Sequence, residues 1–143
     1  MDRKRNLLNR LKVSVLIVAA ALVTVAGLYS FNDVVVGQST WTAPAKAKET
    51  KNPLKDDKAS VAKGQKLFET NCAMCHGKTG AGDGPMAAKL NPKPAHLNKK
   101  TLGGQTDGEL FWKISEGKPP MPPLKASIAE KDRWAIVNYL RTL

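Results

Sequence analysis

We predict an all-α protein from three features of the sequence. Apolar residues recur at helical spacing in three stretches of the C-terminal 85 residues, which indicates amphipathic helices. The segment between the first two stretches, residues 77–105, is rich in Gly, Pro, Asn and Lys and predicts irregular loop with no strands. A long uncharged run near the N-terminus predicts one more helix, separate from the three C-terminal ones.

The N-terminal run extends from Val13 to Asn32 and holds 20 residues without a charge. As a helix it would cover about 30 Å, the thickness of the hydrocarbon core of a bilayer. The preceding segment, residues 1–12, carries five Lys and Arg residues and one acidic residue. Because basic flanks stay in the cytoplasm, we predict a single transmembrane anchor at 13–32. Residues 33–143 would then lie on the other side, the periplasm of a bacterium.

A secretory signal peptide is the alternative interpretation of the same run. The apolar core of a signal peptide is usually about 7–15 residues long, so the length favours a retained anchor. Both interpretations export the rest of the chain. Residues 33–58 are mostly polar, rich in Lys, Ala, Thr and Pro, and show no helical periodicity. We therefore expect a flexible tether there, followed by a folded domain at 59–143.

The first helix of this domain is expected from about Ser60 to Cys72. Its apolar face is marked by Val61, Gly64 and Phe68, at spacings of three and four residues. A domain of this size is near the lower limit for a self-sufficient apolar core. A buried prosthetic group would add to that core.

Two further helices are expected nearer the C-terminus. Thr106 and Glu109 form a capping box for a helix that runs to about Glu116 and ends at Gly117. A second capping box, Ser127-Ile128-Ala129-Glu130, predicts the start of the last helix. The apolar stripe of that helix contains Ile136, Tyr139, Leu140 and Leu143.

The segment Cys72-Ala73-Met74-Cys75-His76 reads C-x-x-C-H, the attachment signature of a c-type haem. On a helix, cysteines three residues apart lie about one turn apart, so both sulfurs can bond to one porphyrin. His76 would then bind the iron as the proximal ligand. We therefore expect one haem c, covalently attached through Cys72 and Cys75, the only cysteines of the chain.

Two other interpretations of the motif are disfavoured. A thioredoxin-like redox pair would lie near a βαβ pattern, and none is visible around Cys72. A zinc site needs four ligands, which Cys72, Cys75, His76 and His96 would have to supply. Cys75 and His76 are adjacent in the chain, which is poor geometry for one tetrahedral metal.

Met121 is the expected distal ligand of the haem iron. Met74 lies between the two cysteines and cannot reach the other face of the ring, and Met86 follows His76 too closely to leave the proximal side. Met121 lies in a proline-rich loop, whose restricted backbone suits the presentation of one thioether to an iron. Two alternatives stay open: Met121 only packs on the haem, or His96 binds the iron instead.

The part of the chain expected outside the cytoplasm is basic, with 18 Lys and Arg against 11 Asp and Glu in residues 33–143. Nucleic acid is not an expected partner of an exported protein. A basic surface would favour docking onto the acidic surface of a redox partner, although solubility and attraction to anionic lipid explain the same charge. The lysines expected near the haem edge are Lys78, Lys89, Lys93, Lys99, Lys100, Lys118 and Lys125.

Residues 60–143 resemble the class I c-type cytochromes, in particular small bacterial members with a single haem. The resemblance rests on motifs that occur in the order of that family. They are Gly64 and Phe68 in the first helix, C-A-M-C-H-G at 72–77, the glycine-rich segment Gly80–Pro85, the methionine loop Gly117–Pro122, and Ile136 with Tyr139 in the last helix. In the family the first and last helices cross, and a glycine lets their backbones approach closely.

The resemblance implies a cytochrome c-like fold of three or more helices around one haem. It also implies that a proline carbonyl accepts the second ring N–H of the proximal histidine, and Pro85 is the matching position. The implied function is single-electron transfer by a protein that is no enzyme by itself, and the anchor predicted at 13–32, which lies outside the resemblance, makes it a membrane-tethered carrier. The alternative is a fixed cytochrome subunit of a larger membrane complex, such as a reductase, a terminal oxidase or a quinol-oxidising complex. A small peroxidase would need an open distal site.

Overall fold

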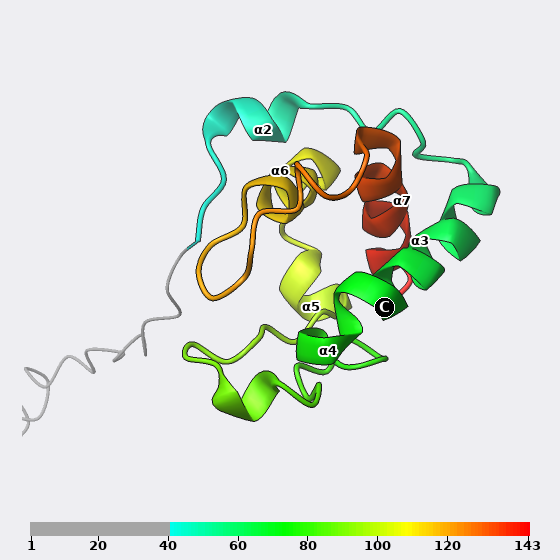
Figure 1. Cartoon of the computed structure of the whole chain (residues 1–143). Coiled ribbons are helices and arrows are strands. Elements are labelled where there is room, and N and C mark those ends of the chain that lie inside the picture. Colours follow the sequence, from blue (N-terminus) through cyan, green and yellow to red (C-terminus); the bar gives the residue numbers. More distant parts are fainter. Residues whose placement is uncertain (1–40) are drawn as a thin grey trace, which may run out of the picture. The chain divides into compact units, whose positions relative to one another are not determined.

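The computed structural model describes residues 41–143, so the predicted anchor at 13–32 lies outside the described residues. These residues form, in order, α2 (Ala45–Glu49), α3 (Lys58–Asn71), α4 (Ala73–His76), the 3-10 turn η1 (Ala87–Lys89), α5 (Lys99–Leu102), α6 (Asp107–Glu116) and α7 (Glu130–Leu140) (Figure 1). Over the same range the only β-pairing is a single bridge between Lys118 and Met121. The all-α prediction is confirmed for this part of the chain. None of its helices is long and apolar enough to cross a membrane.

Helix α3 begins two residues earlier than the sequence analysis predicts, because Asp57 caps it. The Asp57 carboxylate accepts hydrogen bonds from the amides of Ala59 at 2.9 Å and Ser60 at 3.2 Å. Both amides belong to the first turn, where a helix has no internal acceptors for its N–H groups. Ser60, Gly64 and Phe68 follow at four-residue spacing and form the buried face of α3.

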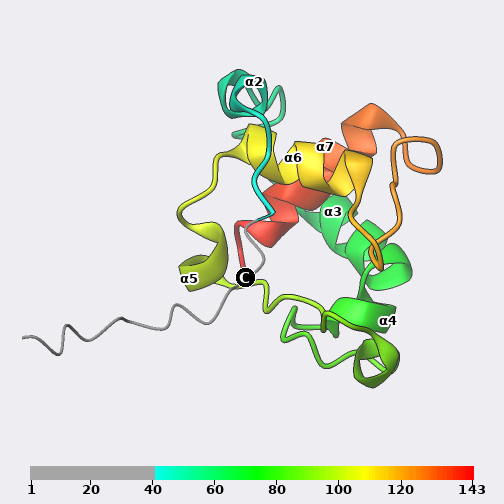
Figure 2. The same cartoon turned by 90° about the vertical axis from the view of Figure 1, so that its left-hand side faces the viewer.

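Helices α3 and α7 pack against each other at Gly64 (Figures 1 and 2). A β-carbon added to Gly64 would lie 2.0 Å from the carbonyl oxygen of Ala135 and 3.0 Å from Cβ of Tyr139. Only glycine permits this approach of two backbones. Beside the contact, the rings of Phe68 and Tyr139 pack with centroids 5.3 Å apart. The contact between the first and last helices and the role of Gly64 therefore agree with the expectation.

Helix α6 forms as the sequence predicts. The Thr106 amide donates to the Glu109 carboxylate at 2.7 Å, and the Glu109 amide donates to the Thr106 hydroxyl at 3.2 Å. This reciprocal pair is the predicted capping box. The helix ends at Glu116, followed by Gly117 with a φ of 64°, a backbone conformation that glycine adopts without strain.

The capping box predicted for the last helix is wrong. Helix α7 begins at Glu130 after Ala129, which supplies no side-chain cap. Ser127 lies in the preceding turn, where its hydroxyl donates to the Leu124 carbonyl at 3.4 Å and the Ile128 amide donates to the same carbonyl at 2.9 Å. The turn satisfies these groups locally, so the serine does not reach the helix. Every residue of α7 from 133 to 140 is buried.

Residues 41–57, which we call the N-terminal strap, are packed on the helical domain rather than extended from it. They lie in the segment predicted as a flexible tether. The strap contains α2, which contacts α6, and its Ala43 and Ala47 are buried. A helix of five residues has too few positions to show a periodic pattern, which explains why the sequence analysis did not predict it.

Candidate functional site

The C-x-x-C-H residues occupy one turn of chain at the end of α3. Cys72 ends that helix with a φ of −120°, and α4 follows at once. The Cys72 carbonyl accepts hydrogen bonds from the amides of Cys75 at 3.1 Å and His76 at 2.8 Å. No disulfide joins the two cysteines, and they and His76 are half-buried. The structure thus brings together the three residues predicted to hold the haem.

The loop after the motif covers the carbonyl groups at the end of α4. Three amides of the loop donate to backbone carbonyls of the motif. Met86 donates to the carbonyl of Met74 at 3.0 Å, Gly84 to that of Cys75 at 3.2 Å, and Gly82 to that of His76 at 2.8 Å. These carbonyls have no partner inside the short helix, so the loop satisfies them and fixes the turn. The backbone of Met86 is therefore held beside the motif.

Glycine is required where this loop touches the motif. A β-carbon at Gly84 would lie 2.4 Å from the Met74 carbonyl oxygen and 2.5 Å from that of Ala73. No side chain fits into this space without moving the backbone of the turn. The glycine-rich segment that resembles the family thus has a physical role, since it lets the loop close over α4.

The imidazole of His76 is oriented by a backbone carbonyl. Its Nδ1 lies 3.1 Å from the carbonyl oxygen of Ala95. A carbonyl only accepts, so we assign the proton to Nδ1, which leaves the lone pair of Nε2 for a metal. Burial lowers the pKa of His76, and the Ala95 hydrogen bond offsets this in part. The ring is therefore neutral at pH 7, the form that binds iron.

The acceptor differs from the one that the resemblance implies. Pro85 was expected to supply the carbonyl, but the hydrogen bond of His76 goes to Ala95, nineteen residues after the histidine. The Ala95 segment is held in place because the Leu97 amide donates to the Gly80 carbonyl at 2.6 Å. A backbone carbonyl leaves no signature in a sequence, so sequence reasoning had no direct means of finding this partner.

The sulfur of Cys72 lies in a largely apolar environment. Burial, and then the nearby Cys75, raise the pKa of Cys72 to about 12. Cys72 packs against the apolar core. Other side chains that pack there while staying partly exposed are Leu67, Leu97, Phe111 and Leu124. Half-covered apolar side chains of the core, together with the cysteine pair and a neutral imidazole, fit a flat apolar cofactor with an iron centre.

Met121 lies in the loop between α6 and α7, which is folded back on itself. Its amide donates to the Lys118 carbonyl at 2.8 Å, and the Lys118 amide donates to the Met121 carbonyl at 3.1 Å. The loop is also fastened to α6, where Leu124 and Lys125 donate to the carbonyls of Ile114 and Ser115 at 3.2 and 3.1 Å. The Met121 side chain is half-buried.

The two views show that the methionine loop extends from α6 toward the half of the molecule that holds α4 (Figures 1 and 2). His96, the alternative ligand, is exposed, and its carbonyl accepts a hydrogen bond from Thr101. The seven lysines expected near the haem edge are all exposed.

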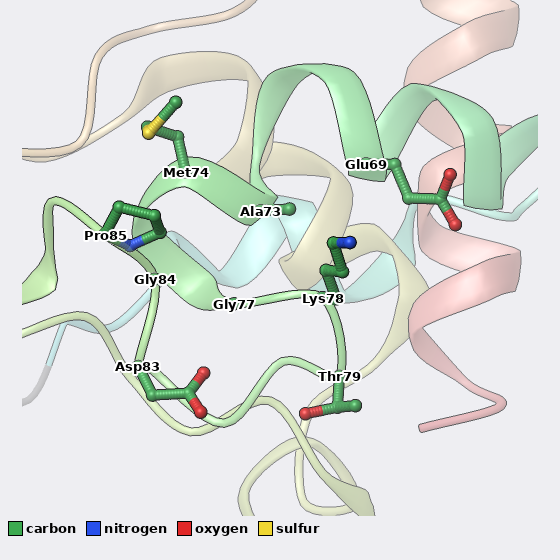
Figure 3. A pocket seen from close by; sticks show the side chains of 9 residues that line it. All are labelled: Glu69, Ala73, Met74, Gly77, Lys78, Thr79, Asp83, Gly84 and Pro85. Atoms are coloured by element: carbon green, nitrogen blue, oxygen red, sulfur yellow. The ribbon is translucent and has the colours of Figure 1, made fainter.

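A hollow of about 480 Å³ lies on the outer side of the C-x-x-C-H turn. Figure 3 shows its lining, in which Met74 and Pro85 lie at one end, Glu69 at the other, and Asp83 below. Cys72, Cys75 and His76 do not line it. The hollow is therefore not where a haem bonded to these residues would lie, and Pro85 belongs to this outer surface.

A small all-helical fold with a C-x-x-C-H turn, a neutral histidine and a fastened methionine loop defines a c-type haem protein. The comparison with known families agrees, since the family model described as Cytochrome c matches residues 61–143. The chain belongs to the cytochrome c family of electron carriers, and its cofactor is a c-type haem.

The chain is similar to several known proteins. Cytochrome c6 of Cladophora glomerata is 33% identical over 84 residues, which cover 59% of this chain and 89% of the relative. Cytochrome c6 of Euglena gracilis is 29% identical over 79 residues, covering 55% and 87%. The FixP subunit of the cbb3-type cytochrome c oxidase of Bradyrhizobium diazoefficiens is 32% identical over 84 residues, which are 58% of this chain but only 27% of FixP.

A solved structure shares the fold. It is a chain of the reducing HAO-like protein complex of Kuenenia stuttgartiensis, with a TM-score of 0.55 and 24% identity. The match covers 65% of this chain and 48% of the other. The N-terminal strap precedes the part of the chain that matches the family model.

Proposed function

We propose that this protein is a membrane-tethered cytochrome with one covalently bound haem c, which transfers single electrons between redox partners on the periplasmic side of a bacterial inner membrane. The observation that carries the proposal is the C-x-x-C-H turn. It holds two cysteines, of which Cys72 packs against the apolar core, and a neutral imidazole that is oriented by the Ala95 carbonyl. The uncharged run at 13–32 and its basic flank support the anchor and its direction.

Each site residue has one task in this proposal. Cys72 and Cys75 would hold the porphyrin by two thioether bonds, and His76 would bind the iron through Nε2. Met121 would supply the second protein ligand of the iron. With both ligands in place the iron would have no open position for a substrate, so the haem would supply electron transfer alone. The haem itself supplies the iron that changes between Fe(III) and Fe(II).

A second candidate is a fixed cytochrome subunit of a larger membrane oxidoreductase. The observation that favours it is the similarity to FixP, whose name describes an oxidase subunit. The same anchor and haem domain serve either role. Exposed lysines around the domain suit an acidic surface of a partner in both cases.

Fractionation of cells that attach haem to exported proteins tests the proposal. We expect the full chain, 15.5 kDa before haem is added, to carry haem stain on a denaturing gel. It should pellet with membranes and resist salt and carbonate washing. A soluble product whose N-terminal sequence begins inside or just after residues 13–32 would show a cleaved signal peptide instead. After detergent extraction, a monomer supports the carrier and a stoichiometric complex supports the subunit.

A further inference from the structure

The N-terminal strap makes contacts that a flexible tether does not make. The rings of Trp41 and Trp112 pack with centroids 6.3 Å apart, and the Lys113 ammonium lies 5.5 Å from the centroid of the Trp41 ring. Ala43 and Ala47 are only 4% and 6% exposed. These apolar contacts cover one face of α6 from the first residue that the structure describes.

The backbones of the strap and α6 touch at Gly108. A β-carbon there would lie 2.0 Å from the Ala47 carbonyl oxygen and 2.7 Å from that of Thr50. A glycine inside a helix normally weakens the helix, and here the close approach of the strap explains its presence. The strap can dock only because Gly108 has no β-carbon.

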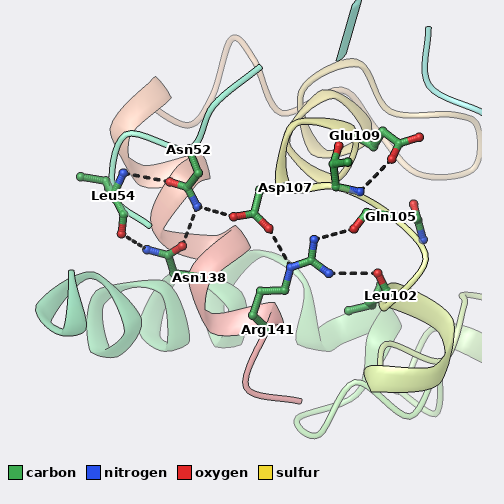
Figure 4. Close-up of polar contacts among 9 residues, drawn as sticks. Asn52, Leu54, Leu102, Gln105, Asp107, Glu109, Asn138 and Arg141 are labelled. Carbon is green, nitrogen blue, oxygen red and sulfur yellow. Dashed lines mark hydrogen bonds and ion pairs between the residues drawn. The ribbon is translucent and has the colours of Figure 1, made fainter. Parts of the chain in front are cut away.

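Asn52 joins the strap to two helices (Figure 4). Its side-chain amide donates to the Asp107 carboxylate at 3.0 Å and to the Asn138 side-chain oxygen at 2.7 Å. Asn138 is buried, and its own amide donates to the Leu54 carbonyl and to the Ser60 hydroxyl, both at 2.6 Å. Removal of the strap would take two hydrogen-bond partners from the buried side chain of Asn138, which would destabilise the folded protein.

Arg141 also binds Asp107, the acidic residue of this network. Its Nε donates to the Asp107 carboxylate at 2.7 Å, and its two remaining nitrogens donate to the carbonyls of Leu102 and Gln105 at 2.9 and 2.6 Å (Figure 4). Asp107 is therefore held by Arg141 as well as by the strap. The acceptor for Asn52 is fixed in place by a residue outside the strap.

We propose that the N-terminal strap stays docked on α6 and α7 in the working protein, and that it thereby shortens the linker between the membrane anchor and the haem. The second part rests on the anchor in the proposed function. The partner class that follows is a redox protein of the same membrane, or one bound directly to its surface, because a haem on a short linker reaches no farther.

The lengths of chain show how much the strap changes. Residues 33–58, if free, would span at most about 90 Å when fully extended, whereas the eight residues 33–40 would span at most about 28 Å. The strap also fixes the point at which the chain leaves the domain, so only the shorter segment is left to act as linker. A shorter linker would raise the effective concentration of the haem domain for partners in the same membrane.

Proteolysis of the full-length holoprotein in detergent tests the docking. Trypsin has four cleavage sites in the strap, after Lys46, Lys48, Lys51 and Lys55. We expect these bonds to be protected in the unchanged protein. The Gly108→Ala variant should be cut there about tenfold faster or more, because the methyl group displaces the strap. Its haem stain should persist, since Gly108 lies outside the haem site.

Two controls make the result specific. Gly104→Ala adds the same methyl group at a glycine with no neighbour within 4 Å, so it should leave the strap protected. Asn52→Ala changes only a residue of the strap and should also speed cleavage. Faster cleavage in this variant would show that release of the strap, rather than misfolding of α6, exposes the bonds. Cleavage of the unchanged strap as fast as in Gly108→Ala and Asn52→Ala would overturn the docking.

A second measurement tests the linker. The full chain is inserted into vesicles of phosphatidylethanolamine and phosphatidylglycerol that carry a headgroup-linked fluorophore, which the haem quenches at short range. We expect strong quenching that weakens in Gly108→Ala and not in Gly104→Ala. Equal quenching by both inserted variants would overturn the short linker. A chain that does not insert at all would instead contradict the anchor, while the proteolysis result would still stand for the strap.

Discussion

Single residues of the haem site are oriented mainly by backbone groups. The Ala95 carbonyl sets the ring of His76, and amides of the following loop hold the carbonyls of Met74, Cys75 and His76. The side chains that carry the chemistry are therefore fixed by backbone groups, which every residue has, although the close approach at Gly84 needs glycine. This explains why the motif residues could be predicted from the sequence and their partners could not.

The first prediction at this scale concerns haem attachment. Cys72→Ala and Cys75→Ala should each leave at most one thioether bond, and the double variant should leave none. Haem-stained denaturing gels after acid-acetone extraction measure the covalent fraction. His96→Ala, at an exposed histidine outside the motif, is the control and should stain fully. Full covalent stain in the double cysteine variant would end the haem c assignment.

The second prediction concerns Met121. A thioether favours Fe(II), so Met121→His should keep the iron six-coordinate and lower its potential by part of the roughly 0.8 V that axial ligands span. Met121→Ala should open the distal face and allow carbon monoxide to bind. Redox titration and carbon monoxide difference spectra measure both effects. Met86→Ala is the matched control and should change neither. Ready carbon monoxide binding by the unchanged protein would show that Met121 is not a ligand.

The N-terminal caps of α3, α6 and α7 differ in how well they can be predicted from the sequence. The capping box of α6 is a local pattern and was predicted to the residue. The start of α7 was wrong because Ser127 forms a hydrogen bond within its own turn instead. Asp57 was overlooked as the cap of α3, although an Asp before a helical pattern is a usual signal.

At the contact of α3 and α7, we predict that Gly64→Ala destabilises the holoprotein by about 1–3 kcal/mol or more. The added methyl group would overlap the Ala135 carbonyl oxygen, at 2.0 Å. Helix propensity alone predicts the opposite, a gain of about 1 kcal/mol. Urea unfolding followed by circular dichroism measures the difference, with Gly104→Ala as the control. An unchanged unfolding midpoint for Gly64→Ala would contradict the close contact.

At the start of α6, Glu109 makes stability depend on pH. The hydrogen bond from the Thr106 amide is the largest cause that holds the pKa of Glu109 below its usual value. A lowered pKa in the folded state means that its stabilisation is present above the unfolded pKa, near 4.5, and is lost as the pH falls through the folded pKa. At pH 7 we therefore expect Glu109→Gln to be less stable by about 1 kcal/mol.

The difference between Glu109→Gln and the unchanged protein should shrink as the pH falls below about 4.5. Glutamine can still accept the hydrogen bond from Thr106, so the comparison isolates the charge. Urea unfolding at pH 7, 5, 4 and 3 gives the profile. Glu116→Gln, at an exposed carboxylate paired with Lys125 at 3.5 Å, is the control and should show little change. A gap between Glu109→Gln and the parent that is independent of pH would contradict the charge effect.

For the whole molecule, the sequence predicted the class of fold and the position of the haem motif but not where the folded unit begins. Patterns of three and four residues revealed the long helices. The strap has no such pattern, because its binding depends on a glycine of α6, Gly108, more than fifty residues away in the chain. Contacts of this kind are properties of the folded chain and cannot be read from the local sequence.

The overall positive charge should govern the encounter with small redox reagents. Residues 33–143 carry a net charge of +7, and the lysines of the loops are exposed. Electron exchange with an anionic iron complex should slow as salt is added, and exchange with a cationic cobalt complex should accelerate. Stopped-flow rates at increasing ionic strength measure both. The same salt dependence for both reagents would show that the haem edge carries no positive field.

The N-terminal strap also has a mechanical consequence. A force applied to the chain before Trp41 acts first on the contacts of Trp41, Ala47 and Asn52, one after another, and reaches α3 only after they are broken. Release of residues 41–57 would lengthen the molecule by about 60 Å while the haem turn stays folded. The strap would thus act as an extensible element that absorbs tension before the electron-carrying part of the protein is strained.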